Sequence, residues 1–454
     1  MSDAETAQLK ARAESEGVEF FFAMFVDMHG KPCAKMVPAE AFDVLMGGGA
    51  GFAGFAAGPM GQSPADPDMI AVPDPASYTV APWQPELAVL QCDIHVEGEP
   101  WPYTPRLILK GMLEKARERG LVYNVGCEAE HFLVRRSAEG RGIELADSLD
   151  RLEAPCYDAK GLTRMFDHLT TVSRYMNRLG WGNYANDHED ANGQFEQNFN
   201  YSDALTSADR LIFYRYMVHT LAHRAGFAAT FMPKPFANLT GSGLHLHSSL
   251  WDATTGAELF ADPGDARGLG LSQMAYQYIG GLIAHAPALA AITCPTVNSY
   301  KRFGVGAPLS GATWAPAYAT YGGNNRTQML RVPDAGRVEN RACDGGANPY
   351  LAMAAQLAAG LDGIDRGLDP GEPNTDNLHV VPAEEAARRG IKVLPPTLLH
   401  AADELVGDDV LRAALGKTPN GDYIDYYAKV KREEFHAWHS VVSDWEVERY
   451  LTLF

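Results

Sequence analysis

A strand that carries two carboxylates on one face most constrains how this chain can fold. The apolar flanks of the segment Val125–Val134 predict a β-strand that contains Glu128 and Glu130. Because residues two apart in a strand point to the same face, these side chains lie next to each other. Like charges this close repel unless a cation lies between them. The strand therefore predicts a metal site, with an acidic surface strand as the alternative.

Two further strand-like segments carry polar side chains where a packed core would need leucine. These side chains are His245, His247 and Ser249 on one segment, and Arg337, Glu339 and Arg341 on the other. A sheet that closes around such faces forms a polar funnel instead of a packed core. We expect such a funnel to be stable only if metal ions and anionic ligands satisfy its charges.

Composition narrows the class of protein. The formal net charge of -19 argues against binding to nucleic acid or to an anionic membrane. No apolar run has membrane-spanning length, and the acidic start lacks a secretory signal, so a cytoplasmic location is expected. The cysteines are scattered singly, which indicates neither a disulfide framework nor a zinc knuckle.

The order of expected elements predicts an α+β protein with two domains. A β-hairpin over 19–37, a glycine-rich loop over 47–61 and a strand over 87–94 form a sheet-rich N-terminal domain. The proline-rich stretch near residue 102 is the expected boundary, which gives domains 1–102 and 103–454. Helices are expected at 106–119, 161–179, 207–225, 272–290, 347–366, 382–389, 397–415 and 422–449.

An acidic segment and an arginine cluster add candidate chemistry. The segment Asp187–Glu196 contributes Glu189 and Glu196, although a solvated acidic loop is the simpler reading of this segment alone. Carboxylates with one imidazole suit Mg²⁺ or Mn²⁺ better than Zn²⁺. The arginines are Arg302, Arg326, Arg331, Arg337 and Arg341. Their forked donors, in an acidic chain, indicate a small anionic substrate, with surface salt bridges as the alternative.

Taken in order, these motifs resemble the glutamine synthetase family over nearly the whole chain. They are the Glu-x-Glu strand at 126–133, the Gly-Gln-x-Glu run at 193–196, the nucleotide-binding signature at 241–250, and the segments 299–302, 325–326, 337–341 and 347–351. The resemblance implies a β-grasp N-terminal domain. It also implies a glutamine synthetase/guanidino kinase-like catalytic domain with an antiparallel, funnel-shaped sheet. It implies a homo-dodecamer in which a neighbour's N-terminal domain completes each active site.

The resemblance also implies roles for individual residues. One metal ion is held by Glu130, Glu189 and Glu196, and the other by Glu128, His245 and Glu339. Glutamate is held by Arg302, Arg341 and the Gly241 backbone, while Arg326 and Arg331 face the ATP phosphates beside His247 and Ser249. The implied reaction phosphorylates the γ-carboxylate of glutamate, and an amine then displaces phosphate. Arg302, Arg326 and Glu189 are the expected catalytic residues, and the base that deprotonates the amine stays open between Glu189 and a metal-bound water.

Two departures concern the amine. Ammonia-using members carry an aspartate in an N-terminal loop and a glutamate in the active-site flap. Here Ala53 takes the place of that aspartate, and the stretch 303–338 contains no glutamate. Ammonium should bind poorly without these charges. The side chains expected to hold an alkylammonium instead are Phe52, Phe55, Trp314, Tyr318 and Tyr321.

The pattern resembles the γ-glutamylmethylamide synthetase branch, which predicts ATP-dependent joining of L-glutamate and methylamine. The alternatives are a glutamine synthetase that uses ammonia, a γ-glutamyl polyamine ligase, and an inactive scaffold or nitrogen sensor. The aromatic side chains could also pack between subunits. The run Asn377-Leu378-His379 lacks the tyrosine that is adenylylated in some family members, so that form of control is not expected.

Overall fold

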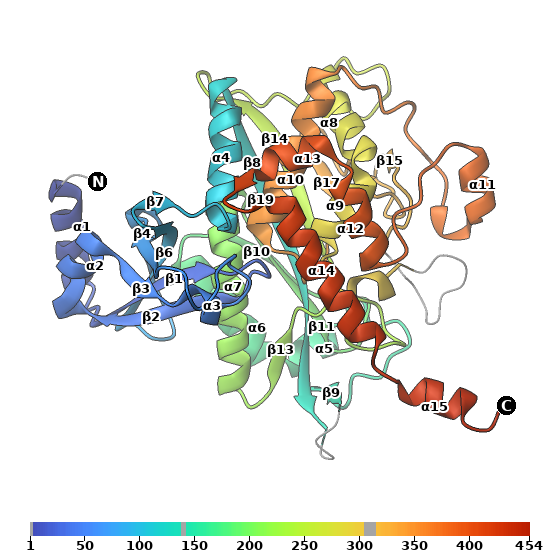
Figure 1. The fold of residues 1–454 in the computed structure, drawn as a ribbon. Helices are drawn as coiled ribbons and strands as arrows, with labels where there is room; N and C mark the ends of the chain where they lie inside the picture. The colour runs from blue at the N-terminus through green and yellow to red at the C-terminus, as the bar shows by residue number, and fades with distance from the viewer. Residues whose placement is uncertain (1–2, 138–141, 304–314) are drawn as a thin grey trace.

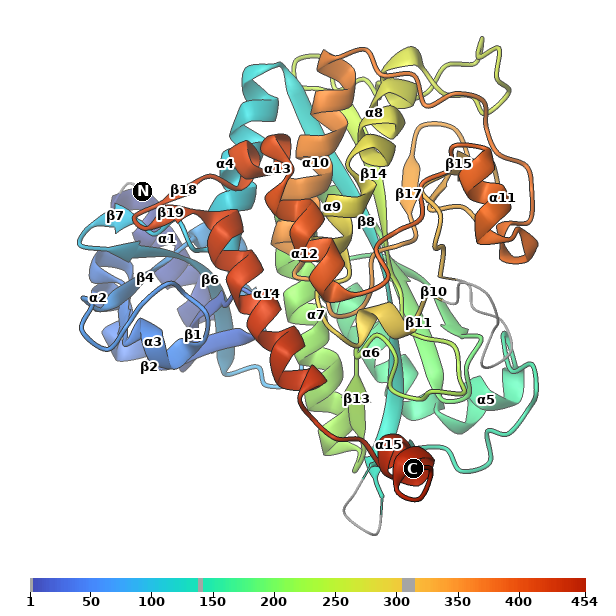
Figure 2. The same ribbon diagram turned by 45° about the vertical axis from the view of Figure 1, so that its right-hand side comes forward.

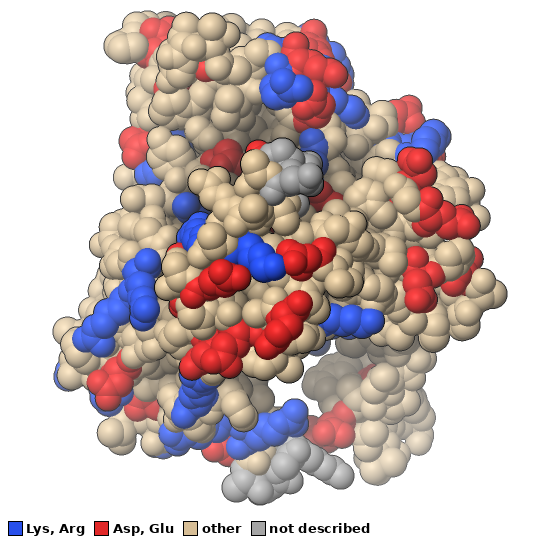
Figure 3. Space-filling model, turned by 90° about the vertical axis from the view of Figure 1, so that its left-hand side faces the viewer, with Lys and Arg blue, Asp and Glu red and all other residues tan. Residues whose placement is uncertain are grey.

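The computed structural model describes residues 3–137, 142–303 and 315–454. The described residues form two large β-sheets with helices packed around them, and the seven-stranded sheet is built from the N-terminal residues (Figure 1). A third sheet is the two-stranded pair of β18 (Lys417–Thr418) and β19 (Gly421–Asp422). Acidic and basic side chains are interspersed on the face that Figure 3 presents. Among the described residues, no helix is long and apolar enough to cross a membrane.

The N-terminal sheet has the strand order β2-β1-β6-β4-β3, with β5 and β7 also paired to β6. Its strands are β1 (Phe20–Val26), β2 (Pro32–Pro38), β3 (Ala50–Phe52), β4 (Met69–Pro73), β5 (Thr79–Val80), β6 (Leu87–Val96) and β7 (Glu99–Pro100). Strands β1 and β6 run parallel, while β1 and β2 form the expected hairpin. Helices α1 (Asp3–Ser15) and α2 (Phe42–Gly48) contribute buried side chains to the core of this sheet.

The prediction of a loop over 47–61 was wrong. This stretch holds the end of α2, strand β3 and the short helix α3 (Gly54–Ala57). Strand β3 forms because β4 supplies a pairing partner, with Ala50 opposite Ala71. Gly49, at φ +72°, must be glycine because a β-carbon there would lie 2.6 Å from the Ile70 side chain.

The larger sheet has the order β10-β11-β8-β14-β17-β16-β15, with β9, β12 and β13 also paired to β8. Its strands are β8 (Leu121–Arg136), β9 (Ile143–Leu145), β10 (Asn183–His188), β11 (Gln194–Phe199), β12 (Ser202–Asp203), β13 (Ala228–Thr230), β14 (Leu244–Asp252), β15 (Tyr321–Gly322), β16 (Leu330–Arg331) and β17 (Val338–Asn340). Strands β15 and β16 are parallel, and the other pairings recorded among the described strands of this sheet are antiparallel.

Helices cover one face of this sheet. Figures 1 and 2 show α4 (Pro105–Glu118), α7 (Ala204–Arg224) and α10 (Pro349–Asp365) along the strands β8 and β14. The side chains of Val125, Cys127 and Ala129 are buried in the core on that side. As the alternation predicts, the side chains of Glu128 and Glu130 line a cavity instead.

Most of the expected helices are present, but several are interrupted. They are α4 (Pro105–Glu118), α5 (Ala159–Arg164), α6 (Phe166–Arg178), α7 (Ala204–Arg224), α8 (Gln273–Ala284), α9 (Ala286–Thr293), α10 (Pro349–Asp365), α11 (Ala383–Arg388), α12 (Leu398–Val406), α13 (Asp409–Leu415), α14 (Tyr423–His439) and α15 (Asp444–Tyr450). The expected helix over 272–290 breaks at His285 because Pro287 begins a new helix there.

Arg106 on α4 connects the N-terminal sheet region to helix α7. Its guanidinium is 4% exposed and forms ion pairs with Asp74, Asp93 and Asp209 at 2.8, 2.8 and 3.0 Å. Asp74 and Asp93 lie in the N-terminal sheet region, and Asp209 lies on α7. Burial alone would lower the pKa of Arg106, but the Asp209 carboxylate outweighs that effect and raises it.

His285 predicts a pH-dependent contribution to stability. Its Nδ1 lies 2.6 Å from Asp408 and its Nε2 lies 3.0 Å from Asp362. Burial would lower the pKa of His285, but these two carboxylates outweigh burial and raise it. The stabilisation is therefore complete below the unfolded-state pKa of about 6.5 and is lost as the pH rises through the folded-state value.

We expect His285→Gln to lower the free energy of unfolding by about 2 kcal/mol at pH 6 and by less at pH 9. Thermal melts at the two pH values measure this difference. His400→Gln, at an exposed site on α12, is the control and should change neither melt. An equal loss at both pH values would contradict the assignment.

Candidate active site

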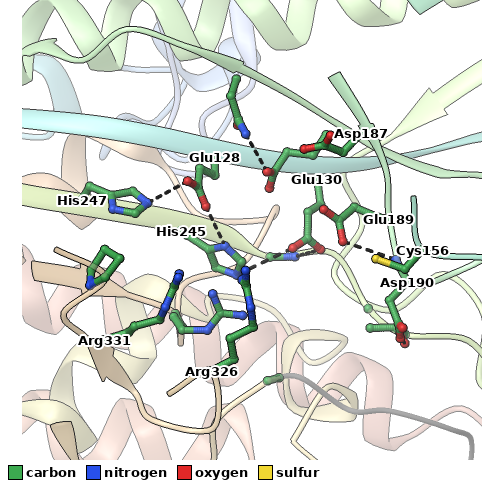
Figure 4. A pocket seen from close by; sticks show the side chains of 18 of the residues that line it. Glu128, Glu130, Cys156, Asp187, Glu189, Asp190, His245, His247, Arg326 and Arg331 are labelled. Atoms are coloured by element: carbon green, nitrogen blue, oxygen red, sulfur yellow. Dashed lines mark hydrogen bonds and ion pairs between the residues drawn. The ribbon is translucent and has the colours of Figure 1, made fainter. Parts of the chain in front are cut away.

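A cavity of about 340 Å³ lies on the polar face of the larger sheet. Figure 4 shows acidic side chains at one end of the cavity and Arg326 and Arg331 near the other. Strands β8, β10, β11, β14 and β16 supply its walls, together with loop residues and with Arg337 and Arg341 on either side of β17. Five of the six predicted metal ligands line this cavity. The sixth, Glu339, does not line it, but its Oε1 lies 3.6 Å from Nδ1 of His245, which does.

The three carboxylates predicted to hold the first metal ion lie close together. One ligand atom each from Glu130, Glu189 and Glu196 lie within 4.8 Å of one another. Glu130 and Glu196 face each other because β11 pairs with β8 in that register. Glu189 follows the end of β10 and comes from the loop that turns at Gly193, where φ is +71°. This all-oxygen set fits a hard divalent cation such as Mg²⁺ or Mn²⁺.

The second predicted set is also brought together, with one addition. His245 Nδ1 lies 3.3 Å from Glu128 Oε2 and 3.6 Å from Glu339 Oε1. His247 was predicted only near the nucleotide, yet its Nε2 lies 3.0 Å from Glu128 Oε1. Groups that could hold an ion include Glu128 with His245 and Glu196, and Glu128 with His247 and Glu339.

Burial, together with repulsion between carboxylates, raises the pKa of two carboxyl groups at the acidic end. Burial, followed by the charge of Glu130, raises the pKa of Glu189 to about 8. Burial, followed by the charges of Glu189 and Glu128, raises the pKa of Glu196 well above its usual range. For Glu128, burial is outweighed by hydrogen bonds from His245 and His247, which lower its pKa. A divalent cation would relieve this repulsion, so the donor set fits the ions that it implies.

Gln194 holds this site in place, and sequence reasoning did not single it out. Its amide nitrogen donates to Glu130 Oε2 at 2.9 Å and to the Gly241 carbonyl at 3.1 Å. The Gly243 N–H donates to the same carboxylate oxygen at 2.8 Å. These contacts fix the orientation of Glu130. Gln194 is part of the Gly-Gln-x-Glu motif, but the sequence alone could not show that its side chain would contact Glu130 and Gly241.

The arginine end is held by buried ion pairs. Arg331 and Arg341 lie 2.7 and 2.6 Å from the two oxygens of Glu339. Burial raises the pKa of Glu339, but His245 and Arg341, among other cations, outweigh this effect and lower it. Arg302 is buried and donates to the Ala342 carbonyl at 3.1 Å. Gly241 packs against Arg302, where a β-carbon would lie 2.7 Å from the Arg302 side chain.

A second cavity of about 280 Å³ adjoins the first and shares Glu128, His247 and Arg337 with it. Aromatic side chains line it, including Tyr184, Tyr201 and Trp251. Ser249 also lines this second cavity and accepts a hydrogen bond from Trp251 Nε1 at 3.0 Å. An aromatic cavity beside one that arginines and carboxylates line offers the kinds of contact that bind a nucleotide.

The sequence model of the glutamine synthetase catalytic domain matches residues 102–450. The chain belongs to the glutamine synthetase family. A glutamate–methylamine ligase of Methyloversatilis universalis is 45% identical over 455 residues, which cover 100% of both chains. A glutamine synthetase of Rhizobium leguminosarum bv. phaseoli is 42% identical over 448 residues, covering 99% of this chain and 100% of the relative. A solved structure described as a GmaS/ADP complex superposes with a TM-score of 0.90 at 46% identity, covering 98% of this chain and 99% of the other.

Phe52 and Phe55, two of the aromatic residues expected at the amine site, do not line the cavity of their own chain. Phe52 packs edge-on against Phe25 at 4.9 Å in the N-terminal sheet, and Phe55 is 49% exposed. Trp314 lies outside the described residues.

The prediction that Tyr318 and Tyr321 line the amine site was wrong. Both are buried, and their hydroxyls donate to the carbonyls of Val381 and Gly371. They belong to the packing of the loop that carries Arg326, and they do not line the cavity. Their aromatic character suggested a ligand role because sequence alone gives no packing partners for a residue in a loop.

Several cavity residues had no role in the sequence analysis. They are Cys156, Tyr157, Asp187, Asp190, Asn198 and Thr240. Asn198 donates to Glu196 Oε1 at 2.9 Å, and Thr240 donates to Asp190. The two aspartates lie in the acidic segment that had been singled out, whereas nothing in the sequence marked Cys156 and Tyr157.

Proposed function

We propose that this protein joins the γ-carboxylate of L-glutamate to methylamine and converts ATP to ADP and phosphate. The product is N5-methyl-L-glutamine. The carrying observation is that a chain similar over its full length to a glutamate–methylamine ligase retains all six carboxylate and imidazole ligands around one cavity. An inactive scaffold would have no reason to retain buried carboxylates whose mutual repulsion opposes folding.

The chain's own residues divide the work between two ends of the cavity. Arg302 and Arg341, with the Gly241 backbone, hold the carboxylate of glutamate. Arg326 and Arg331 face the phosphates and stabilise the negative charge that develops on the transferred phosphoryl group. Two or more divalent cations, Mg²⁺ or Mn²⁺, would be held by Glu130, Glu189 and Glu196 and by Glu128, His245 and Glu339. When bound, they neutralise charge on the phosphates.

The aromatic cavity is proposed to receive the adenine and ribose of ATP. Tyr184, Tyr201 and Trp251 offer flat apolar surfaces to a purine, while His247 and Ser249 provide polar contacts. The cavity meets the first one at Glu128, which places the phosphates next to the proposed metal ions.

The family resemblance supports further proposals about architecture. They are a β-grasp domain over 1–102, a catalytic domain over 103–454 with a funnel-shaped sheet, a cytoplasmic location and a homo-dodecamer. In such an assembly Phe52 and Phe55 of one subunit would meet the cavity of the next. Small and aromatic side chains there leave room for an alkyl group and offer cation–π contact to an alkylammonium.

The amine is tested by measuring phosphate release with methylamine, ammonia, ethylamine and putrescine. We expect kcat/KM to be highest for methylamine, by about tenfold over ammonia, because both expected ammonium-binding acids are absent. A higher kcat/KM for ammonia would establish the second candidate, a glutamine synthetase, which the 42% identity to the Rhizobium enzyme favours. A higher value for putrescine would establish a polyamine ligase.

A variant with a restored acid sharpens this test. Ala53→Asp should shift the preference toward ammonia because it returns a carboxylate to the N-terminal loop. Ala53→Asn has nearly the same size without the charge and should leave the preference unchanged. Equal effects of the two variants would show that Ala53 does not face the amine.

A further inference from the structure

The carbonyl oxygen of Asp376 gathers hydrogen-bond donors from the turn that carries Arg326. The donors are Asn325 Nδ2 at 2.8 Å, Thr327 Oγ1 at 3.2 Å and Gln328 Nε2 at 3.3 Å. Arg326 stands between the first two of these residues and lines the cavity. The backbone on both sides of this arginine is therefore tied to one point of a segment that lies 50 residues away.

The turn is also closed on itself. The single proton of the Thr327 hydroxyl is shared between the Asp376 carbonyl and Asn325 Oδ1, which lies closer, at 2.7 Å. The Thr327 N–H donates to the same Asn325 oxygen at 3.0 Å. The Leu378 N–H donates to the Thr327 hydroxyl at 3.1 Å. Thr327 is buried, so these hydrogen bonds are shielded from competing water.

The segment that receives these bonds, residues 374–381, is itself fixed to the body of the protein. Asp376 forms an ion pair with Arg389 at 2.6 Å, next to the end of α11. Leu378, in the same segment, packs in a small apolar cluster with Tyr318 and Ala386. The Tyr318 hydroxyl donates to the Val381 carbonyl at 2.9 Å. Tyr318 therefore holds this segment in place and does not contribute to the amine site.

We infer that Asn325 and Thr327 are positioning residues that direct Arg326 into the cavity, with segment 374–381 as the buttress behind them. This inference rests on the proposed role of Arg326 toward the phosphates. The Arg326 side chain is long and exposed, so its guanidinium reaches one point reproducibly only if its Cα is fixed. Locking the flanking residues removes part of the ordering cost from the reaction.

A double-mutant cycle tests the inference in the full-length enzyme. Thr327→Val keeps the shape of the side chain and removes its hydroxyl. We expect kcat to fall about tenfold while KM for glutamate changes less than about twofold, because the binding groups stay in place. In an Arg326→Ala background, the same substitution should lower kcat by less than about twofold, since no arginine is left to direct. Thr327→Ser should restore most of the activity.

The outcomes distinguish a failure of the positioning role from a failure of the proposed role of Arg326. An equal tenfold loss in both backgrounds would overturn the positioning role and leave that of Arg326 intact. No loss for Arg326→Ala by itself would overturn the proposed role of Arg326. Thr220→Val, which removes a threonine hydroxyl bonded to the Tyr216 carbonyl on α7, is the matched control and should not change kcat. If Thr327→Val does not fold, Asn325→Ala is put through the same cycle with the same two outcomes.

Discussion

A Glu130→Gln variant should lose at least about 100-fold in activity and most of its affinity for Mn²⁺ at the Glu130, Glu189 and Glu196 site. The substitution keeps the size of the side chain but removes one of three charges that converge on a single point. An amide oxygen is a weaker ligand than a carboxylate, and it would keep accepting from Gln194 and Gly243. The amide NH₂, which is a donor and no metal ligand, would then take the position of Oε1, 3.7 Å from His245 Nε2. Titration of free Mn²⁺ and phosphate release measure the two losses.

The same substitution should not lower the melting temperature of the metal-free protein. Burial and the neighbouring carboxylates raise the pKa of Glu196, so removing one negative charge relieves repulsion in the folded state. Glu144→Gln, on the exposed side of β9, is a matched control that should change neither metal affinity nor activity. Wild-type Mn²⁺ affinity in Glu130→Gln would remove this residue from the metal site.

An Arg326→Ala variant should lower kcat by about 1,000-fold while KM for ATP changes only a few-fold. A cation aimed at the transferred phosphoryl group gains interaction energy as charge develops, so its loss falls on the rate more than on binding. Steady-state kinetics with saturating glutamate and varied ATP separate the two constants.

Arg326→Lys should recover only part of the rate, because an ammonium keeps the charge but lacks the planar fork of donors. Arg366→Ala, which removes an exposed arginine that pairs with Asp362 at the end of α10, is the surface control and should leave kcat unchanged. A loss confined to KM would assign Arg326 to binding of the ground state and not to the reaction step.

The strand that carries Glu128 and Glu130 could be predicted because side-chain alternation is a property of the extended backbone itself. The same reasoning identified β14 with His245 and β17 with Glu339. The order of the motifs indicated the family, and the family match confirmed it. Glycine content misled the prediction over 47–61, since pairing with β4 outweighs the low strand propensity of this stretch.

The roles of Tyr318 and Gln194 could not be predicted from sequence. Tyr318 packs against Leu378 and donates to the Val381 carbonyl, which lies 63 residues further along the chain. Gln194 bridges Glu130 on β8 and the Gly241 carbonyl, which lie 64 and 47 residues away from it. Local sequence patterns have no information about such distances. The pKa values at the acidic end depend in the same way on neighbours from different strands.

The sequence by itself determined which side chains share a strand face, because the geometry of the backbone dictates that over a few residues. It also determined the kinds of ligand that those side chains can bind. Only the tertiary structure decided that β8, β11, β14 and β17 pair in the register that assembles two carboxylate groups, and that His247 approaches Glu128. Register and packing arise from contacts between distant segments, and they set the distances on which metal binding and charge depend.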